Sequence, residues 1–271
     1  LDGLGRIRPE IIVADNNSKD DTYNFAAALA GNFPTEIRIL KVARPGKSAA
    51  MNDAVKSASG AVLAFLDDDV IVDKTWLAAV ERFFSASEHH AGQGIIRLQS
   101  PAGDDPDIIR LFERYRTIPS LEHKPNKPSR HSLNGANFFV SRAAFDRVGG
   151  FDERLGPGAS GTSEDVDFAR RLIRAQITIA YAPQAIVYHR VDRSRLCDRY
   201  FEQLHRRQGV SRLLIKNRCY VKILSNLGYA YLRYFYYSLG GNERRRYLNL
   251  GRVFHYREMA KAKHNGGQKH Q

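Results

Sequence analysis

Short apolar runs alternate with longer segments of helical character along the first two thirds of the chain. The runs EIIVAD (10–15), EIRILKV (36–42) and AVLAFL (61–66) are separated by the helix-like segments YNFAAALAGNF (23–33) and KSAAMNDAVKSA (47–58). Strands that are joined by helices build a sheet with helices on its faces, because each connection must cross over the sheet. The sequence therefore predicts an open, mostly parallel α/β sheet flanked by helices.

The alternation continues to about residue 190. The Pro-containing polar stretch from Ser100 to Ser132 cannot be assigned from its pattern. Elsewhere we expect a helix from about Lys74 to Phe84 capped by Asp73, a strand in NFFVSR, a short helix in AAFDRVG, a mobile loop in GPGASGTS, a helix in EDVDFARRLIRAQ and two short strands in ITIAYAPQAIVYHR.

The charge is concentrated in the C-terminal part of the chain. The formal net charge is +13, and residues 190–271 contain 19 Lys and Arg against 5 Asp and Glu, so the whole excess lies there. The pattern beyond Arg190 is helical and rich in Tyr. We therefore expect two domains, residues 1–190 with the α/β sheet and residues 191–271 as a basic, aromatic-rich helical tail.

Tyr and Phe are interleaved with Arg and Lys in the segment SRLLIKNRCYVKILSNLGYAYLRYFYYSLGG (211–241). This composition suits the headgroup region of an anionic membrane surface, where basic groups and aromatic rings are both stabilised. Binding of nucleic acid is a second interpretation, which we favour less. A third is a helical subdomain whose aromatic residues pack against the sheet.

Other features bear on location. No run of 18 or more apolar residues occurs, and Lys222 and Arg233 interrupt the most apolar C-terminal segment. The two cysteines, Cys197 and Cys219, are too few for a disulfide framework, which fits a reducing, cytoplasmic setting with peripheral attachment to the inner face of the membrane. The first residues, LDGLGRIRPE, lack an initiator Met and the apolar segment of a signal peptide, and we expect that an N-terminal part is missing.

Three adjacent aspartates, Asp67, Asp68 and Asp69, follow directly after the strand-like run AVLAFL. In an extended chain, Asp67 and Asp69 point to one side and Asp68 to the other. Two converging carboxylates favour a hard divalent cation, and the carboxyl ends of strands are where ligands of open α/β sheets bind. The alternative is that the acids only complement the dipole of the next helix, a task for which Asp73 is better placed.

The sequence matches two nucleotide-binding motifs only in part. RPGKS (44–48), followed about twenty residues later by AFLDDD, resembles a P-loop and its acidic strand. However, Lys41 occupies the place of the first glycine, and Pro45 stiffens the loop. A dinucleotide-binding GxGxxG follows no predicted strand, although Asp15 ends a strand as a ribose-binding acid would.

A second acidic cluster, Glu164, Asp165 and Asp167, begins a predicted helix after a glycine-rich loop. The positive end of the helix dipole stabilises ionised carboxylates there, which suits a general base. Thr162 and Asp165 also have the spacing of a capping box, and the residues alone leave both interpretations open.

Taken in order, four segments resemble the motifs of family 2 glycosyltransferases with the GT-A (Rossmann-like) fold, over about residues 10–190. The segments are EIIVADNNSKDDT, PGKSAAMNDAVKSASGAVLAFLDDDV, GGFDERLGPGASGTSEDVDFARRL and IAYAPQAIVYHR. The resemblance implies roles for single residues: Asp15, Lys47, Asp67 and Asp68 in binding the nucleotide-sugar, Asp69 and His189 as metal ligands, Asp165 as the catalytic base, and Glu164 beside the acceptor.

The resemblance also implies the reaction. The enzyme would move a hexosyl-type sugar, with inversion, from a nucleotide-diphosphate donor to a saccharide or lipid-linked acceptor, using Mg²⁺ or Mn²⁺, in cell-envelope or exopolysaccharide synthesis. The family opens with a strand and a helix ahead of EIIVAD, and its processive members carry a QxxRW element that this chain lacks, which favours transfer of a single sugar. The alternative is a non-catalytic domain that binds nucleotide-sugar without turnover.

Overall fold

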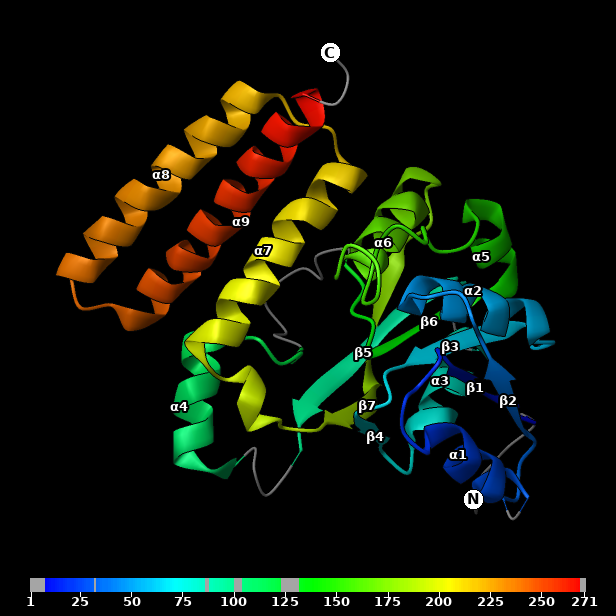
Figure 1. Cartoon of the computed structure of the whole chain (residues 1–271). Coiled ribbons are helices and arrows are strands. Elements are labelled where there is room, and N and C mark those ends of the chain that lie inside the picture. The colour runs from blue at the N-terminus through cyan, green and yellow to red at the C-terminus, as the bar shows by residue number, and fades with distance from the viewer. Residues whose placement is uncertain (1–7, 32, 86–87, 100–103, 123–131, 269–271) are drawn as a thin grey trace. The chain divides into compact units, whose positions relative to one another are not determined.

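The computed structural model describes residues 8–31, 33–85, 88–99, 104–122 and 132–268, which form two compact units (Figure 1). The first unit is made of Leu1–Arg97, Ser120–Ala159 and Glu164–Arg190. The second unit is made of Leu98–Pro119, Ser160–Ser163 and Val191–Gln271. Each unit has hydrophobic clusters of its own. The sequence predicted two domains, residues 1–190 and 191–271, and this division stays a prediction.

The strands of the first unit form two sheets. In the smaller sheet, β1 (Ile11–Asp15) pairs in parallel with β2 (Ile37–Lys41). The larger sheet has the strand order β3-β6-β5-β7-β4, in which β6 is antiparallel to β3 and β5, and β4 is antiparallel to β7. Their bounds are Val62–Leu66 (β3), Val70–Val72 (β4), Ala91–Leu98 (β5), Asn137–Ser141 (β6) and Ile179–His189 (β7).

The expected α/β class is confirmed, with one correction to the sheet. In the larger sheet the pairs β3–β6, β5–β6 and β4–β7 are antiparallel, whereas the sequence predicted a mostly parallel sheet. The physical reason is that a strand such as NFFVS, buried on both faces, reads as a continuous apolar run whatever the direction of its neighbours.

Helices of the first unit cover both faces of the larger sheet. Neighbouring residues of β6 point to opposite faces, so Phe138 joins the cluster that contains Phe145 and Phe168, and Phe139 joins the cluster that contains Trp76. Phe145 and Phe168 come from one layer of helices, and Trp76 comes from another. The helices of this unit are α1 (Thr22–Ala30), α2 (Lys47–Ser57), α3 (Trp76–Ser85), α5 (Arg142–Val148) and α6 (Glu164–Arg174).

A buried side-chain amide, that of Asn137, connects strands of the larger sheet through hydrogen bonds. Asn137 has no exposed surface; its Oδ1 accepts a hydrogen bond from Trp76 Nε1 (2.9 Å), and its Nδ2 donates to the carbonyl oxygens of Ile95 and Ala185. A Cβ atom at Gly94 would lie 2.2 Å from Asn137 Nδ2, so β5 needs a glycine at this position. The sequence did not predict β5, because its glycines interrupt the apolar run AGQGIIRL.

Most other predicted elements occur close to the expected residues. The strands expected at 10–15, 36–42 and 61–66 and in NFFVSR are present, and so are the expected helices. The helix expected from Lys74 begins at Trp76, and Asp73 Oδ1 accepts from the Thr75 backbone N–H (2.9 Å). The short strand β4 was not predicted.

Two stretches differ from the prediction. The segment that was expected to form two short strands forms the single strand β7, and Pro183 lies outside its pairing with β4, which involves only residues 187–189. The unassigned stretch contains α4 (Pro106–Tyr115), whose first turn is capped by Asp105, with Pro106 in the first helical position. Residues 100–103 and 123–131 of that stretch lie outside the described residues.

The second unit is helical, as expected beyond Arg190. Besides α4 it contains the 3₁₀-helix η2 (Arg193–Arg195) and the helices α7 (Asp198–Ile215), α8 (Tyr220–Leu239) and α9 (Glu243–Gln268). Helix α9 packs against both α7 and α8 (Figure 1). Helices α7 and α9 approach closely at glycines, since a Cβ atom at Gly251 would lie 2.4 Å from His205 Nε2. Among the helices described, none is both long and apolar enough to cross a membrane.

Candidate functional site

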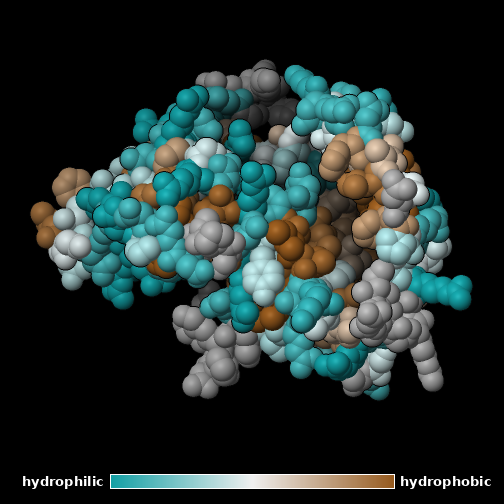
Figure 2. Space-filling view, turned by 90° about the horizontal axis from the view of Figure 1, so that it is seen from below, coloured by the Kyte–Doolittle hydropathy of each residue, from teal (hydrophilic) through white to brown (hydrophobic). Residues whose placement is uncertain are grey.

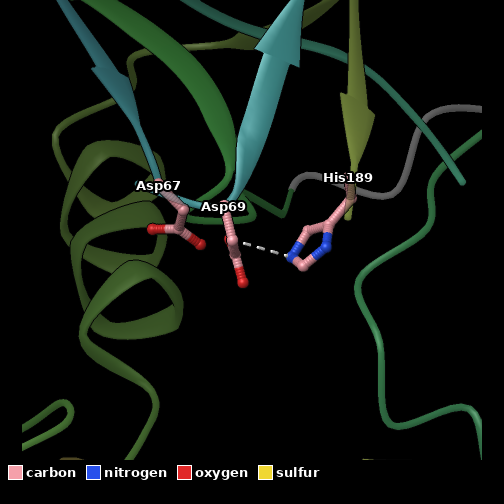
Figure 3. A group of neighbouring side chains, drawn as sticks. All are labelled: Asp67, Asp69 and His189. Carbon is pink, nitrogen blue, oxygen red and sulfur yellow. Dashed lines mark ion pairs between the residues drawn. The ribbon is translucent and has the colours of Figure 1, made fainter. Parts of the chain in front are cut away.

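The three adjacent aspartates lie in the turn between β3 and β4. Strand pairing places Val70 opposite His189, and the Arg190 N–H donates to the carbonyl oxygen of Asp69 (2.8 Å). These backbone contacts bring the end of β7 beside the turn. Figure 3 shows the side chains of Asp67, Asp69 and His189 pointing to the same side of the strand ends, and their ligand atoms all lie within 4.8 Å of one another.

The surroundings of His189 suit a metal ligand. Only 1% of its side chain is exposed, and Nδ1 lies 2.9 Å from the carbonyl oxygen of Arg190. A carbonyl only accepts hydrogen bonds, so Nδ1 is the donor in this contact, and Nε2 lies 3.3 Å from Asp69 Oδ1. A backbone partner for the second ring nitrogen is usual in metal-binding histidines, and here it leaves Nε2 facing the carboxylates. Two carboxylates and one imidazole therefore fit Mg²⁺ or Mn²⁺.

Lys47, the first residue of α2, connects the two acidic clusters. Its Nζ contacts Asp67 Oδ1 and lies 3.7 Å from Glu164 Oε1. Burial alone would lower the pKa of Lys47, but the charges of Asp67 and Glu164 outweigh it, so the pKa is raised and the ammonium stays charged.

The glycine-rich loop fixes the start of α2. The Lys47 N–H donates to the carbonyl oxygen of Pro157 (2.9 Å), and the Gly46 N–H donates to Asn16 Oδ1 (2.7 Å). Gly158 has a positive φ of 83°, and a Cβ atom there would lie 2.8 Å from the Gly46 Cα. These two N–H groups of RPGKS therefore already have protein partners, whereas a P-loop keeps such groups free for phosphate.

The second acidic cluster begins α6. Asp165 accepts hydrogen bonds from the backbone N–H groups of Gly135 (3.1 Å, to Oδ2) and Val166 (2.7 Å, to Oδ1). In these two hydrogen bonds Asp165 accepts from N–H groups other than that of Thr162, which is the donor that the capping box would use. Burial raises the pKa of both Asp165 and Glu164, which makes each carboxylate a stronger base than it would be in water.

Gly135 brings the two clusters into one site. Its N–H donates to Asp165, and a Cβ atom built on it would lie 3.2 Å from Lys47 Nζ and 3.7 Å from Asp67 Oδ1. The turn that carries it is held by the buried Gln93, whose Oε1 accepts from the Asn134 N–H (2.6 Å). This turn was not predicted, although the Asn-Gly pair at 134–135, directly before a strand, is a turn signal.

The structure thus brings together six of the eight residues singled out from the sequence: Lys47, Asp67, Asp69, Glu164, Asp165 and His189. The other two lie apart from these contacts. Asp15 is buried at the end of β1, where Oδ1 accepts from the Ser18 N–H (3.1 Å), and Asp68 is exposed in the turn. The arrangement offers a cation site, an ammonium group and a basic carboxylate next to one another.

Comparisons with known proteins identify the family of the chain. Residues 4–209 match the family described as "Glycosyltransferase like family 2". The chain is 26% identical over 180 residues to Glycosyltransferase AglE of Haloferax volcanii, a match that covers 66% of this chain and 56% of that protein. It is 28% identical over 191 residues to the succinoglycan biosynthesis protein ExoM of Rhizobium meliloti, covering 70% and 59%. The chain therefore spans less than two thirds of the length of these relatives.

A solved structure supports the GT-A fold. The mannosyltransferase PcManGT from Pyrobaculum calidifontis, in complex with GDP-Man and Mn²⁺, has a TM-score of 0.51 and 18% sequence identity. The match covers 80% of this chain and 55% of that chain. At 18% sequence identity this similarity is evidence for the fold alone.

Proposed function

We propose, from the premise that this chain belongs to glycosyltransferase family 2, that it moves a sugar from a nucleoside-diphosphate donor to an acceptor hydroxyl with inversion at the anomeric carbon. The observation that carries this proposal is the meeting of two acidic clusters. Lys47 contacts Asp67 and approaches Glu164, and Gly135 lies against both Asp67 and Asp165. A transferase needs these two groups side by side, because one faces the leaving diphosphate and the other the incoming hydroxyl.

The proposed chemistry starts at Asp165. Its carboxylate takes the proton of the acceptor hydroxyl, and the oxygen then attacks the anomeric carbon. The bond from that carbon to the diphosphate oxygen breaks, and its electron pair leaves with the nucleoside diphosphate. Glu164 lies next to Asp165 in sequence and would contact the acceptor. The raised pKa of Asp165 suits this role, since a more basic carboxylate takes a proton more readily.

Groups on the donor side would stabilise the negative charge of the leaving group. Asp67, Asp69 and His189 would hold Mg²⁺ or Mn²⁺, which when bound supplies positive charge for the diphosphate. The ammonium group of Lys47 lies against this site and adds a second positive charge. Asp15, at the end of β1, and Asp68, in the turn, would contact the nucleotide-sugar.

The wider role is inferred from the relatives. The names of the similar proteins include a succinoglycan biosynthesis protein and a minor teichoic acid biosynthesis protein, which supports a hexosyl-type transferase of cell-envelope or exopolysaccharide synthesis. The acceptor would be a saccharide or a lipid-linked saccharide. A lipid-linked acceptor would lie in a membrane, and we propose that the enzyme acts at the cytoplasmic face as a peripheral protein.

The non-catalytic alternative makes a different prediction for one experiment. The chain is titrated with UDP- and GDP-sugars with and without Mn²⁺ by calorimetry, and the release of nucleoside diphosphate is then followed with saccharide and lipid-linked acceptors. The transferase predicts metal-dependent binding followed by release that depends on acceptor. Binding without release would favour the non-catalytic domain, and absence of binding would contradict both.

A further inference from the structure

Helix α8 packs through one side only. Ile223 and Ala230, two helical turns apart, are buried, and Ile223 belongs to a cluster with Met259 and Ala260 of α9. Figure 1 shows α8 at the outer side of the second unit, next to α9. The opposite side of this 20-residue helix, about 30 Å long, has no packing partner among the described residues of the unit.

The exposed side of α8 is apolar. Val221, Leu232 and Leu239 project within about 20° of one another, opposite the buried residues, and Phe235 lies beside them. Their exposed fractions are 73%, 71%, 86% and 67%. In Figure 2 hydrophobic side chains are seen at the left-hand tip of the second unit, the end at which α8 terminates. Exposed apolar side chains that share one helix face in this way indicate an interaction surface.

Tyrosines border this stripe on both sides. Tyr220 and Tyr231 project to one side of it, and Tyr229 and Tyr236 project to the other. All four are exposed. Tyr is enriched where one end of a side chain meets hydrocarbon and the other meets water, so a hydrocarbon-facing stripe with phenol groups along both edges fits the boundary of a bilayer.

The surroundings of the stripe are basic. The only charged residues of α8 are Lys222 and Arg233, and residues 216–263 contain eleven Lys and Arg against two acids, Glu243 and Glu258. Basic residues beside an apolar helix face are attracted to anionic headgroups when the helix lies in the plane of the membrane.

Contacts hold part of this charge close to the tyrosines. Arg233 donates to the hydroxyl groups of Tyr229 (3.1 Å) and Tyr237 (3.2 Å) and lies over both rings. Arg245 of α9 also donates to Tyr237 (3.1 Å). Arg233 is therefore held against Tyr229 at one edge of the stripe, whereas Tyr237 and Arg245 lie on the side of α8 that faces α9.

We propose that the exposed stripe of α8, formed by Val221, Leu232, Phe235 and Leu239, docks the enzyme on an anionic phospholipid bilayer. The proposal deepens, and rests on, the peripheral location proposed above. A second copy of the chain is a poorer occupant, because it would bring an equal excess of positive charge against this one. Nucleic acid is poorer too, because its phosphates would face an uncharged aliphatic stripe.

The test is co-flotation of the full chain with vesicles. Vesicles of phosphatidylcholine with 30% phosphatidylglycerol are compared with vesicles of phosphatidylcholine alone. We expect the bound-to-free ratio to be about tenfold higher or more with the anionic vesicles, and high salt to reduce it. The double substitution Leu232→Glu and Phe235→Glu should lower binding to the anionic vesicles by at least about tenfold.

A matched control separates the stripe from net charge. The double substitution Phe25→Glu and Leu29→Glu changes the charge equally at exposed residues of α1 (67% and 49% exposed) and should leave flotation unchanged. Equal effects of both variants, or no flotation of the wild-type chain, would overturn the proposal. The proposal would also be overturned if the wild-type chain were a dimer in ultracentrifugation and only the α8 variant were a monomer. Calorimetry with nucleotide-sugar should be the same for all three proteins, so a failure here is distinct from a failure of the proposed transferase.

Discussion

Replacing Asp165 by Asn should stop transfer and leave the donor bound. The substitution keeps the shape of the side chain and removes the base that takes the acceptor proton. General-base catalysis contributes about 10²- to 10⁴-fold, so we expect kcat to fall by that factor, or about 3 to 5 kcal/mol of activation free energy. The carboxamide has one acceptor oxygen for the two N–H donors of Gly135 and Val166, and the unpaired donor should lower the stability by about 1 to 3 kcal/mol.

The assay compares transfer with binding over a range of pH. Donor affinity, measured by calorimetry, should change little, because the donor is held by groups at the other acidic cluster. Burial raises the pKa of Asp165 above the ordinary 3.8, so wild-type transfer should decline as the pH falls toward that raised pKa, and the decline should be absent from the residual activity of Asp165→Asn. The control Asp167→Asn alters a carboxylate of the same helix that pairs with Arg171 (2.8 Å) and should retain transfer. Equal losses of donor affinity and transfer in Asp165→Asn would refute the role of base.

Three further predictions concern the metal site and the second unit. In Asp69→Ala, Mn²⁺-dependent binding of nucleoside diphosphate should be lost by calorimetry, and an unchanged dependence on Mn²⁺ would exclude Asp69 as a ligand. Burial lowers the pKa of His205 and His255 from 6.5 to about 4, so the folded state disfavours their protonation. Stability should therefore be full above pH 6.5 and fall as the pH drops toward 4, by up to about 2 kcal/mol per histidine at pH 5, and equal urea midpoints at pH 7.5 and 5 would contradict this. Gly251→Ala places a Cβ atom 2.4 Å from His205 Nε2 and should lower the stability by about 1 to 3 kcal/mol. Its control, Gly228→Ala on α8, meets no atom within 4 Å and should raise the stability by up to about 1 kcal/mol. Calorimetric melting curves that rank the two variants otherwise would count against this packing of α7 and α9.

The sequence predicted the helices and strands in which the pattern of apolar residues is clear. NFFVSR forms a strand and EDVDFARRLIRAQ forms a helix, since local pattern and tertiary burial agree there. AVLAFL forms a strand although Val62 and Leu66 are exposed. β5 was not predicted because Gly92 and Gly94, which make room for Phe139 and Asn137, disrupt the apolar run. The direction of β6 also has no local signal, because it is decided by which strands lie next to it.

The candidate site was predictable where residue chemistry is concentrated. The pair Asp67 and Asp69 and the acids at the start of α6 are visible as clusters, and order along the chain suggested that they meet. Gly135 was not predictable as part of the site, because its contribution is a backbone N–H group and not a side chain. The contact of Lys47 with Asp67 depends on the loop that holds the start of α2, which is a tertiary contact.

The most direct test of the proposed site is an anomalous diffraction map of crystals grown with Mn²⁺ and a nucleoside diphosphate. We predict a manganese peak within coordination distance of Asp69 and His189, with diphosphate oxygens on the metal and Asp165 facing the same solvent-filled space. A peak elsewhere on the chain, or packed protein between the diphosphate and Asp165, would contradict it.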